Sequence, residues 1–138
     1  MIIIRLWHKD LIPYLSKNQL LGQWRECCCI AKNIADNGTP NHILVNKIMN
    51  YPPSHFIVYC NFVWKEMRSR GYKCNYSKVG QYLPDVGLQY VLDSDLFKNW
   101  HNDRYLKQCL MNLQEKYDCG GISNEEWDII VNKFKEYF

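Results

Sequence analysis

The sequence predicts an all-α fold, with four or five helices packed around one core in a single compact domain. Two observations carry this prediction. Apolar residues recur at helical spacing through most of the 138-residue chain. No pair of alternating segments joined by a hairpin turn is visible, which argues against a sheet. A chain of this length can bury a core without a metal or disulfide staple, so residues 1–138 are expected to form one domain.

The first long helix is expected to begin at Ser16, which forms an S-x-x-Q capping box with Gln19. From Leu20 onward an apolar stripe runs at helical spacing through Trp24 and continues to residue 35. Gly38 follows as the C-terminal stop. Trp24 lies on the stripe, so we expect it in the core.

Three further helices follow from the same kind of pattern. Residues 43–49 are expected to form a short helix, and residues 56–71 the clearest amphipathic helix in the chain. A long helix is expected from about residue 95 to 117, ended by two glycines. The stretch 72–87 is rich in Gly, Pro, Asn and Ser, so little regular structure is expected there.

The last helix is expected to open with a second capping box, formed by Ser123 and Glu126. Its core face is expected to run from Trp127 to Phe138.

Composition narrows the classes of function. The net charge of +3 and the pI near 8.4 allow an anionic partner, but only a local patch could bind nucleic acid. Seven cysteines contain no CxxC pair, so free thiols in a reducing cytoplasm are favoured over a zinc site. The N-terminal apolar run is too short for a signal peptide, and no apolar segment is long enough to cross a membrane. We therefore expect a soluble cytoplasmic protein.

Glu26 is the first candidate for chemistry. It follows Arg25 on the first helix, off the apolar stripe and close along the chain to the N-terminal amine. An amine and a carboxylate are the minimal equipment for imine chemistry on a sugar. The alternative is a solvated Arg–Glu pair. Gly22, one turn earlier on the same face, either leaves room for a substrate or lets another helix pack closely.

Two stretches of the N-terminal third resemble a known family. They are Arg5-Leu-Trp-His-Lys-Asp-Leu-Ile-Pro-Tyr-Leu15 and Gln19-Leu-Leu-Gly-Gln-Trp-Arg-Glu-Cys27. Together they resemble the start of the bacterial branch of the pyrimidine dimer DNA glycosylases, a family that includes the bacteriophage endonuclease V. The resemblance covers roughly residues 5–32, and segments 55–71 and 101–106 are similar with lower specificity. It implies an endonuclease V-like all-α fold.

The resemblance implies a glycosylase and abasic-site lyase that works without metal or cofactor, as a monomer. The α-amine of the chain, here that of Met1, would attack C1′ of the 5′ nucleotide of a thymine dimer. Glu26 would stabilise the cationic sugar and assist proton removal at C2′. The partner implied is double-stranded DNA that contains pyrimidine dimers or abasic sites. An α-amine has a reference pKa near 7.7–8.0, so a usable fraction is neutral at physiological pH.

The same resemblance and the distribution of charge give candidate DNA contacts. Arg5 matches a family arginine that contacts DNA near the lesion, and Arg25 could hold a phosphate. His8 could move a proton or make a structural hydrogen bond. Further candidates, each with a solvated or core role as the alternative, are Gln19, Gln23, Trp24, Lys65, Arg68, Arg70, Lys73, Arg104 and Lys107.

The N-terminus departs from the family pattern. Ile2 is a bulky second residue that blocks removal of the initiator Met, and three isoleucines precede Arg5. An extended segment would displace the amine by roughly 7–11 Å. Either the start site differs, the terminus folds back, another amine such as that of Lys9 acts, or the protein has lost the lyase activity. Three hypotheses therefore stand. The first is the glycosylase and lyase, the second is a protein that binds damaged DNA without cutting it, and the third is a helical interaction module unrelated to DNA.

Overall fold

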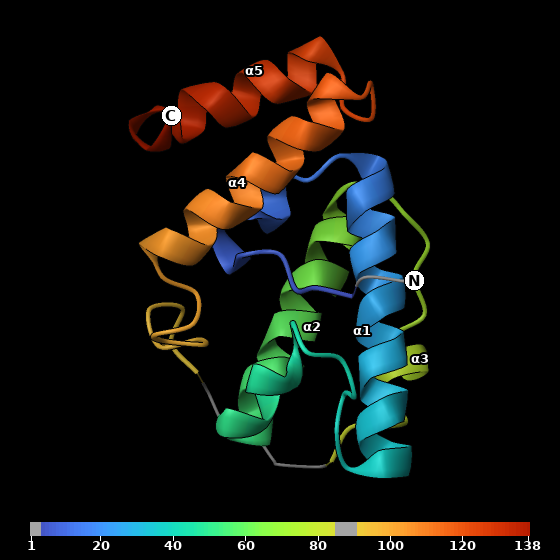
Figure 1. The fold of residues 1–138 in the computed structure, drawn as a ribbon. Coiled ribbons are helices and arrows are strands. Elements are labelled where there is room, and N and C mark those ends of the chain that lie inside the picture. The colour runs from blue at the N-terminus through green and yellow to red at the C-terminus, as the bar shows by residue number, and fades with distance from the viewer. Residues whose placement is uncertain (1–3, 85–90) are drawn as a thin grey trace.

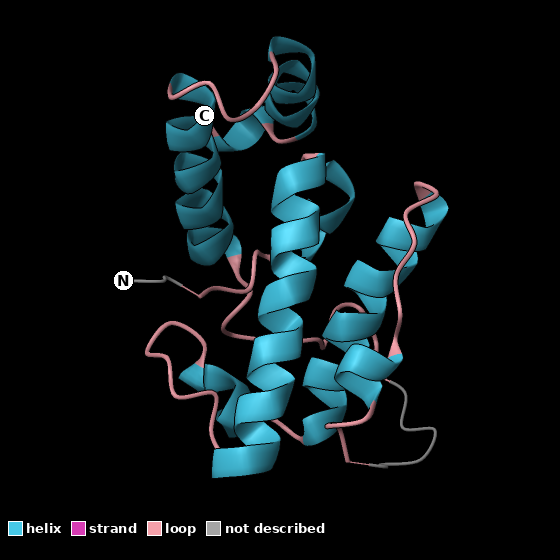
Figure 2. Cartoon of the chain, turned by 90° about the vertical axis from the view of Figure 1, so that its right-hand side faces the viewer, coloured by secondary structure: helices cyan, strands magenta, loops and turns pink. Residues whose placement is uncertain are grey.

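The computed structural model describes residues 4–84 and 91–138, and these are built from helices and their connections (Figures 1 and 2). This confirms the all-α prediction. The α-helices of these residues are α1 (Lys17–Asn37), α2 (Pro53–Ser69), α3 (Ser77–Gly80), α4 (Asp103–Asp118) and α5 (Asn124–Lys133). Short 3₁₀ helices are η1 (Lys9–Tyr14), η2 (Asn46–Asn50) and η3 (Lys135–Tyr137).

Helices α1 and α2 pack side by side and run in opposite directions (Figure 1). Helix α4 crosses above them and packs on α5, while the N-terminal segment passes between α1 and α4 (Figure 1). Ile4, Leu6 and Trp7 of that segment are core residues. The start of the described chain is thereby fixed in the interior.

The predicted caps lie where the sequence placed them. The Ser16 hydroxyl accepts the backbone N–H of Gln19 at 3.5 Å, but the Gln19 amide oxygen has no partner among the described residues, so the reciprocal half of the predicted capping box is not formed. Gly38 ends α1 in the left-handed conformation, with φ of 75°, and its N–H donates to the Ile34 carbonyl at 2.9 Å. Ser123 and Glu126 form the reciprocal capping box at the start of α5. Trp24 is buried, as its position on the stripe predicts.

Two predicted helices begin elsewhere. Residues 43–45 form a turn, and only the 3₁₀ helix η2 follows, so the prediction of a short helix over 43–49 was wrong. The long helix begins at Asp103 and not near residue 95. Phe97 and Asn99 have positive φ angles of 51° and 74°, which interrupt a right-handed helix. Asn102 then caps α4, its side chain accepting the Tyr105 N–H at 2.9 Å.

The expected irregular stretch contains one helical turn, α3, and its residues 85–87 lie outside the described ranges. Phe138 is exposed, so the prediction that the core face of the last helix runs to Phe138 was wrong. Within residues 4–84 and 91–138, no helix is both long and apolar enough to cross a membrane.

Candidate active site

The N-terminal segment is held by hydrogen bonds from three helices. Its backbone N–H at Arg5 donates to Glu26 Oε2 of α1 at 3.2 Å. Tyr59 of α2 donates its hydroxyl to the Trp7 carbonyl at 2.5 Å, and Tyr105 of α4 donates to the carbonyl of Leu6. The segment lies outside any helix, so its backbone groups have no partner in regular secondary structure, and these bonds satisfy them. They also fix the path of the chain toward its start.

Gln23 is the centre of this arrangement. Its amide oxygen accepts the Trp7 N–H at 2.7 Å and lies 2.9 Å from the Tyr59 hydroxyl oxygen, whose proton is directed at the Trp7 carbonyl. Its amide nitrogen donates to the Arg5 carbonyl at 2.9 Å and to Glu26 Oε2 at 3.3 Å. Sequence reasoning placed Gln23 at the distorted DNA step. The side chain is instead only 1% exposed, and its amide is used inside the protein.

Glu26 is half-buried on α1, one turn after Gln23. Burial raises the pKa of its carboxyl above the ordinary value, while the Arg5 N–H and the charges of Arg5, Lys116 and Arg25 oppose the rise. Among the described residues no hydrogen-bond donor reaches Oε1 of Glu26.

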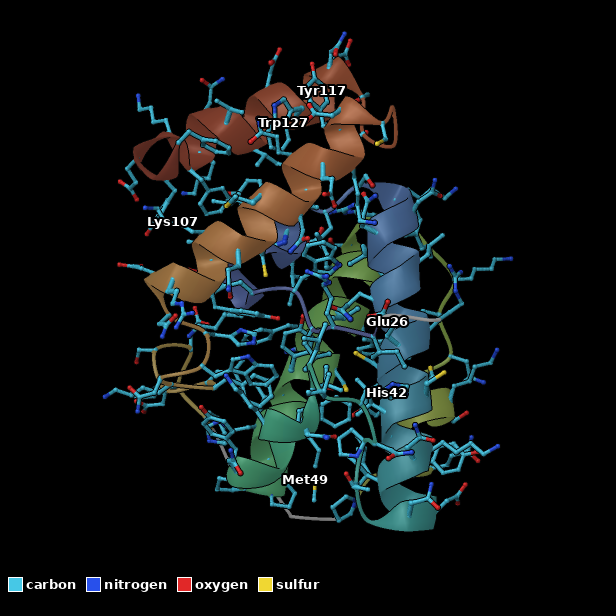
Figure 3. The ribbon with its side chains drawn as sticks, in the orientation of Figure 1. Glu26, His42, Met49, Lys107, Tyr117 and Trp127 are labelled. Carbon is cyan, nitrogen blue, oxygen red and sulfur yellow. The ribbon has the colours of Figure 1, made fainter. Side chains whose placement is uncertain are left out.

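The surface beside Glu26 is open. Among the residues that the structure describes, a Cβ added to Gly22 would meet only the Arg25 guanidinium, at 3.9 Å, so no described helix packs against this glycine. This favours the first of the two explanations for Gly22. In Figure 3, Glu26 lies on α1 between α4, above it, and the segment that carries His42, below it.

A cavity of about 420 Å³ borders the Arg5 end of this site. Its walls come from the N-terminal segment, the turn at residues 43–45 and α4, through Arg5, Leu44, Tyr105 and Met111 among others. The Arg5 guanidinium lies over the Trp7 ring, 5.2 Å from the ring centroid, which orients it.

The remaining predicted contacts fall in separate places. Arg25 is exposed and lines a groove of about 790 Å³ together with Lys73 and Lys78. Gln19 is half-buried, and its amide oxygen is enclosed without a partner among the described residues. Arg104 and Lys107 are exposed on α4.

The basic cluster predicted at the end of α2 is divided. Lys65 and Arg68 are exposed, and Arg68 stacks over Trp64 with its guanidinium carbon 4.9 Å from the ring centroid. Arg70 instead pairs with Glu66 at 2.8 Å and donates to the carbonyls of residues 13 and 15 at 3.0 and 2.7 Å. Its guanidinium therefore ties η1 to α2 and is not free to grip a phosphate.

His8 takes the structural role of the two that the sequence allowed. It is buried, its Nδ1 accepts the Asp10 N–H at 3.1 Å, and its ring stacks on His101 at 5.1 Å. Burial lowers the pKa of both imidazoles. The Lys9 ammonium donates to the Asp93 carbonyl and lies 3.8 Å from its carboxylate, so it is already paired. Neither His8 nor Lys9 borders the cavity beside Arg5.

Tyr59 and Tyr105 are the residues of this site that the sequence analysis did not assign. A tyrosine on an apolar helical stripe carries a hydroxyl that needs a partner when buried, and this was the available signal. The partners, carbonyls of residues 6 and 7, could not be read from spacing. Met1, the proposed source of the amine, lies outside the described residues.

Comparisons with known proteins give one match. The sequence profile described as pyrimidine dimer DNA glycosylase matches residues 4–79, more than half of the chain. The matched range includes the N-terminal segment, α1, α2 and most of α3. No curated protein and no solved structure matches significantly.

Proposed function

Because the chain belongs to the pyrimidine dimer DNA glycosylase family, we propose that it cuts DNA at pyrimidine dimers by imine chemistry. In this proposal it is both a glycosylase and an abasic-site lyase. The N-terminal amine is the nucleophile, and Glu26 is the catalytic carboxylate.

The chemistry proceeds in two stages. The neutral amine attacks C1′ of the 5′ nucleotide of the dimer, the glycosidic bond breaks, and the base accepts a proton as it leaves. The resulting iminium carries positive charge, which the Glu26 carboxylate stabilises. Removal of a proton from C2′ then expels the 3′ phosphate by β-elimination, and the strand is cut.

One observation carries the proposal: the Glu26 carboxylate holds the backbone of Arg5, at the start of the described chain. The amide nitrogen of Ile4 is one residue earlier. Covalent geometry therefore puts it within about 7 Å of Glu26 Oε2, given the 3.2 Å bond to Arg5. A chain whose amine lay at residue 4 would have nucleophile and carboxylate on the two sides of one deoxyribose.

The three residues before Ile4 bear directly on activity. If they extend outward, the amine of Met1 lies farther from Glu26 than that of Ile4 would. If they fold back over the site, the Met1 amine comes close to Glu26 again. Binding to damaged DNA without cutting is the result that the first geometry favours.

The test is incision of a duplex with one cis-syn thymine dimer, measured in single turnover. Glu26→Gln removes the carboxylate but keeps an oxygen that can accept the Arg5 N–H. We expect its rate to fall at least about 100-fold, the scale of a lost acid–base group. Glu136→Gln, at an exposed glutamate of η3, should cut at the parent rate. Full-rate incision by Glu26→Gln would remove Glu26 from the mechanism.

A further inference from the structure

Two exposed apolar side chains border the cavity next to Arg5. Leu44, in the turn at residues 43–45, is 45% exposed, and Met111 on α4 is 70% exposed. Ile43, which precedes Leu44, is 88% exposed. Such side chains face water at a cost, and the two that share the rim of one cavity, Leu44 and Met111, indicate a surface that becomes covered.

The charges around this rim indicate what covers it. Arg5 lines the same cavity, and the Glu26 carboxyl next to it feels the positive charges of Arg5, Arg25 and Lys116. The Arg5 guanidinium suits a phosphate at the edge of this cavity. Glu115 lines the cavity as well and disfavours a phosphate inside it. Leu44 and Met111 form an apolar patch among the polar side chains of this cavity, and this patch, with a carboxylate in the same wall, suits bases and not the DNA backbone.

The proposed reaction requires such a surface. C1′ is poorly accessible inside a stacked duplex, so the step at the lesion must be opened before an amine can attack. Proteins that open a step commonly insert Leu, Ile or Met between bases, with cations on the flanking phosphates.

We propose that Leu44 and Met111 form an apolar wedge that enters the base stack beside the lesion and makes cutting selective for dimers. The inference rests on the proposed function, since the wedge serves the attack at C1′. Leu44 and Met111 act as positioning residues: they open the step and touch no reacting atom. The rigid helix α4 sets Met111, and the turn before η2 sets Leu44.

An abasic site distinguishes a wedge from a general DNA contact. It has no base to unstack at the reacting sugar, so the wedge should matter far less there than at a dimer. We would compare Leu44→Ala, Met111→Ala and the double variant on duplexes that carry either lesion. Ile129→Ala is the matched control, because Ile129 is an apolar side chain of α5 with 57% exposure and does not line this cavity.

The double variant should lose about tenfold or more in rate at the dimer and change little at the abasic site. The control should match the parent on both. Equal losses on both lesions, or none on either, would overturn the wedge. Circular dichroism spectra equal to that of the parent would show that each variant is folded.

A second readout does not depend on cutting. With 2-aminopurine placed next to the dimer, binding of the parent should raise its fluorescence through unstacking, and binding of the double variant should not. Unstacking by a parent protein that fails to cut would refute the proposed activity but keep the wedge. The same fluorescence rise with the double variant would refute the wedge. A parent that binds no damaged DNA would refute both.

Discussion

Replacing Gln23 by leucine tests whether its buried amide holds the N-terminal segment in place. Leucine has a similar size but cannot hydrogen-bond. The Trp7 N–H would lose its 2.7 Å partner, and the Arg5 carbonyl its 2.9 Å partner. Tyr59 would keep its bond to the Trp7 carbonyl, and Glu26 its bond to the Arg5 N–H. Two buried backbone groups are therefore orphaned.

At about 1–3 kcal/mol for each orphaned group, the expected loss in free energy of unfolding is about 2–6 kcal/mol before the gain from burying leucine is subtracted. Urea denaturation followed by tryptophan fluorescence measures it. Hydrogen exchange at the Trp7 amide should accelerate as well, because Gln23 is its acceptor. The rate of borohydride trapping on DNA that carries a thymine dimer should also fall. Displacing the N-terminal segment by about 1 Å is enough to slow a reaction that needs a near-attack geometry.

The matched control is Gln19→Leu on the same helix. Gln19 has an enclosed amide oxygen without a partner among the described residues, so leucine there should be neutral or stabilising. A Gln23→Leu protein within about 0.5 kcal/mol of the parent would refute the account of the segment, because surface-like substitutions fall in that range.

Three further predictions concern stability and binding. Glu26→Gln should be more stable than the parent at pH 7, because the raised pKa of Glu26 makes its ionised form unfavourable in the fold. This gain in stability should vanish below the pKa of an unfolded glutamate, near 4.3, where the carboxyl is protonated in both states. Calorimetry across pH measures it. Burial lowers the pKa of His101 to about 2, so the unfolded chain alone takes up this proton below pH 6.5. The parent should therefore lose about 1.4 kcal/mol per pH unit more than His101→Gln between pH 6 and 4 in urea unfolding; equal slopes would refute this. Gly22→Ala should gain about 1 kcal/mol from helix propensity. Its methyl stands on the open face, so salt-dependent binding to dimer DNA should weaken; unchanged affinity would mean that DNA does not approach there.

The helices that the sequence predicted well carry local signals. Ser16, Gly38 and Ser123 mark helix ends through backbone chemistry that depends on a few neighbouring residues. The start of α4 was missed because Phe97 and Asn99 adopt left-handed conformations, which tertiary packing imposes and propensity does not announce.

The candidate site was likewise predictable only in part from the sequence. The resemblance selected Glu26, and the structure holds it against the Arg5 backbone. The roles of Gln23 and Arg70 were not predictable from charge or polarity. Both side chains turn inward. Gln23 donates to a carbonyl 18 residues away in sequence, and Arg70 donates to carbonyls 55 and 57 residues away. Tyr105 reaches a carbonyl 99 residues away. Such long-range partners leave no periodic trace in one sequence.

Borohydride trapping on a duplex with one cis-syn thymine dimer tests the central claim most directly. Intact mass and peptide mapping would locate the adduct in the full chain and in a chain trimmed to begin at Ile4. The account predicts an adduct on the α-amine. If residues 1–3 extend outward, the trimmed chain should form it faster, because its amine then lies closer to Glu26. An adduct on Lys9, or none with either chain while a known lyase reacts, would contradict it.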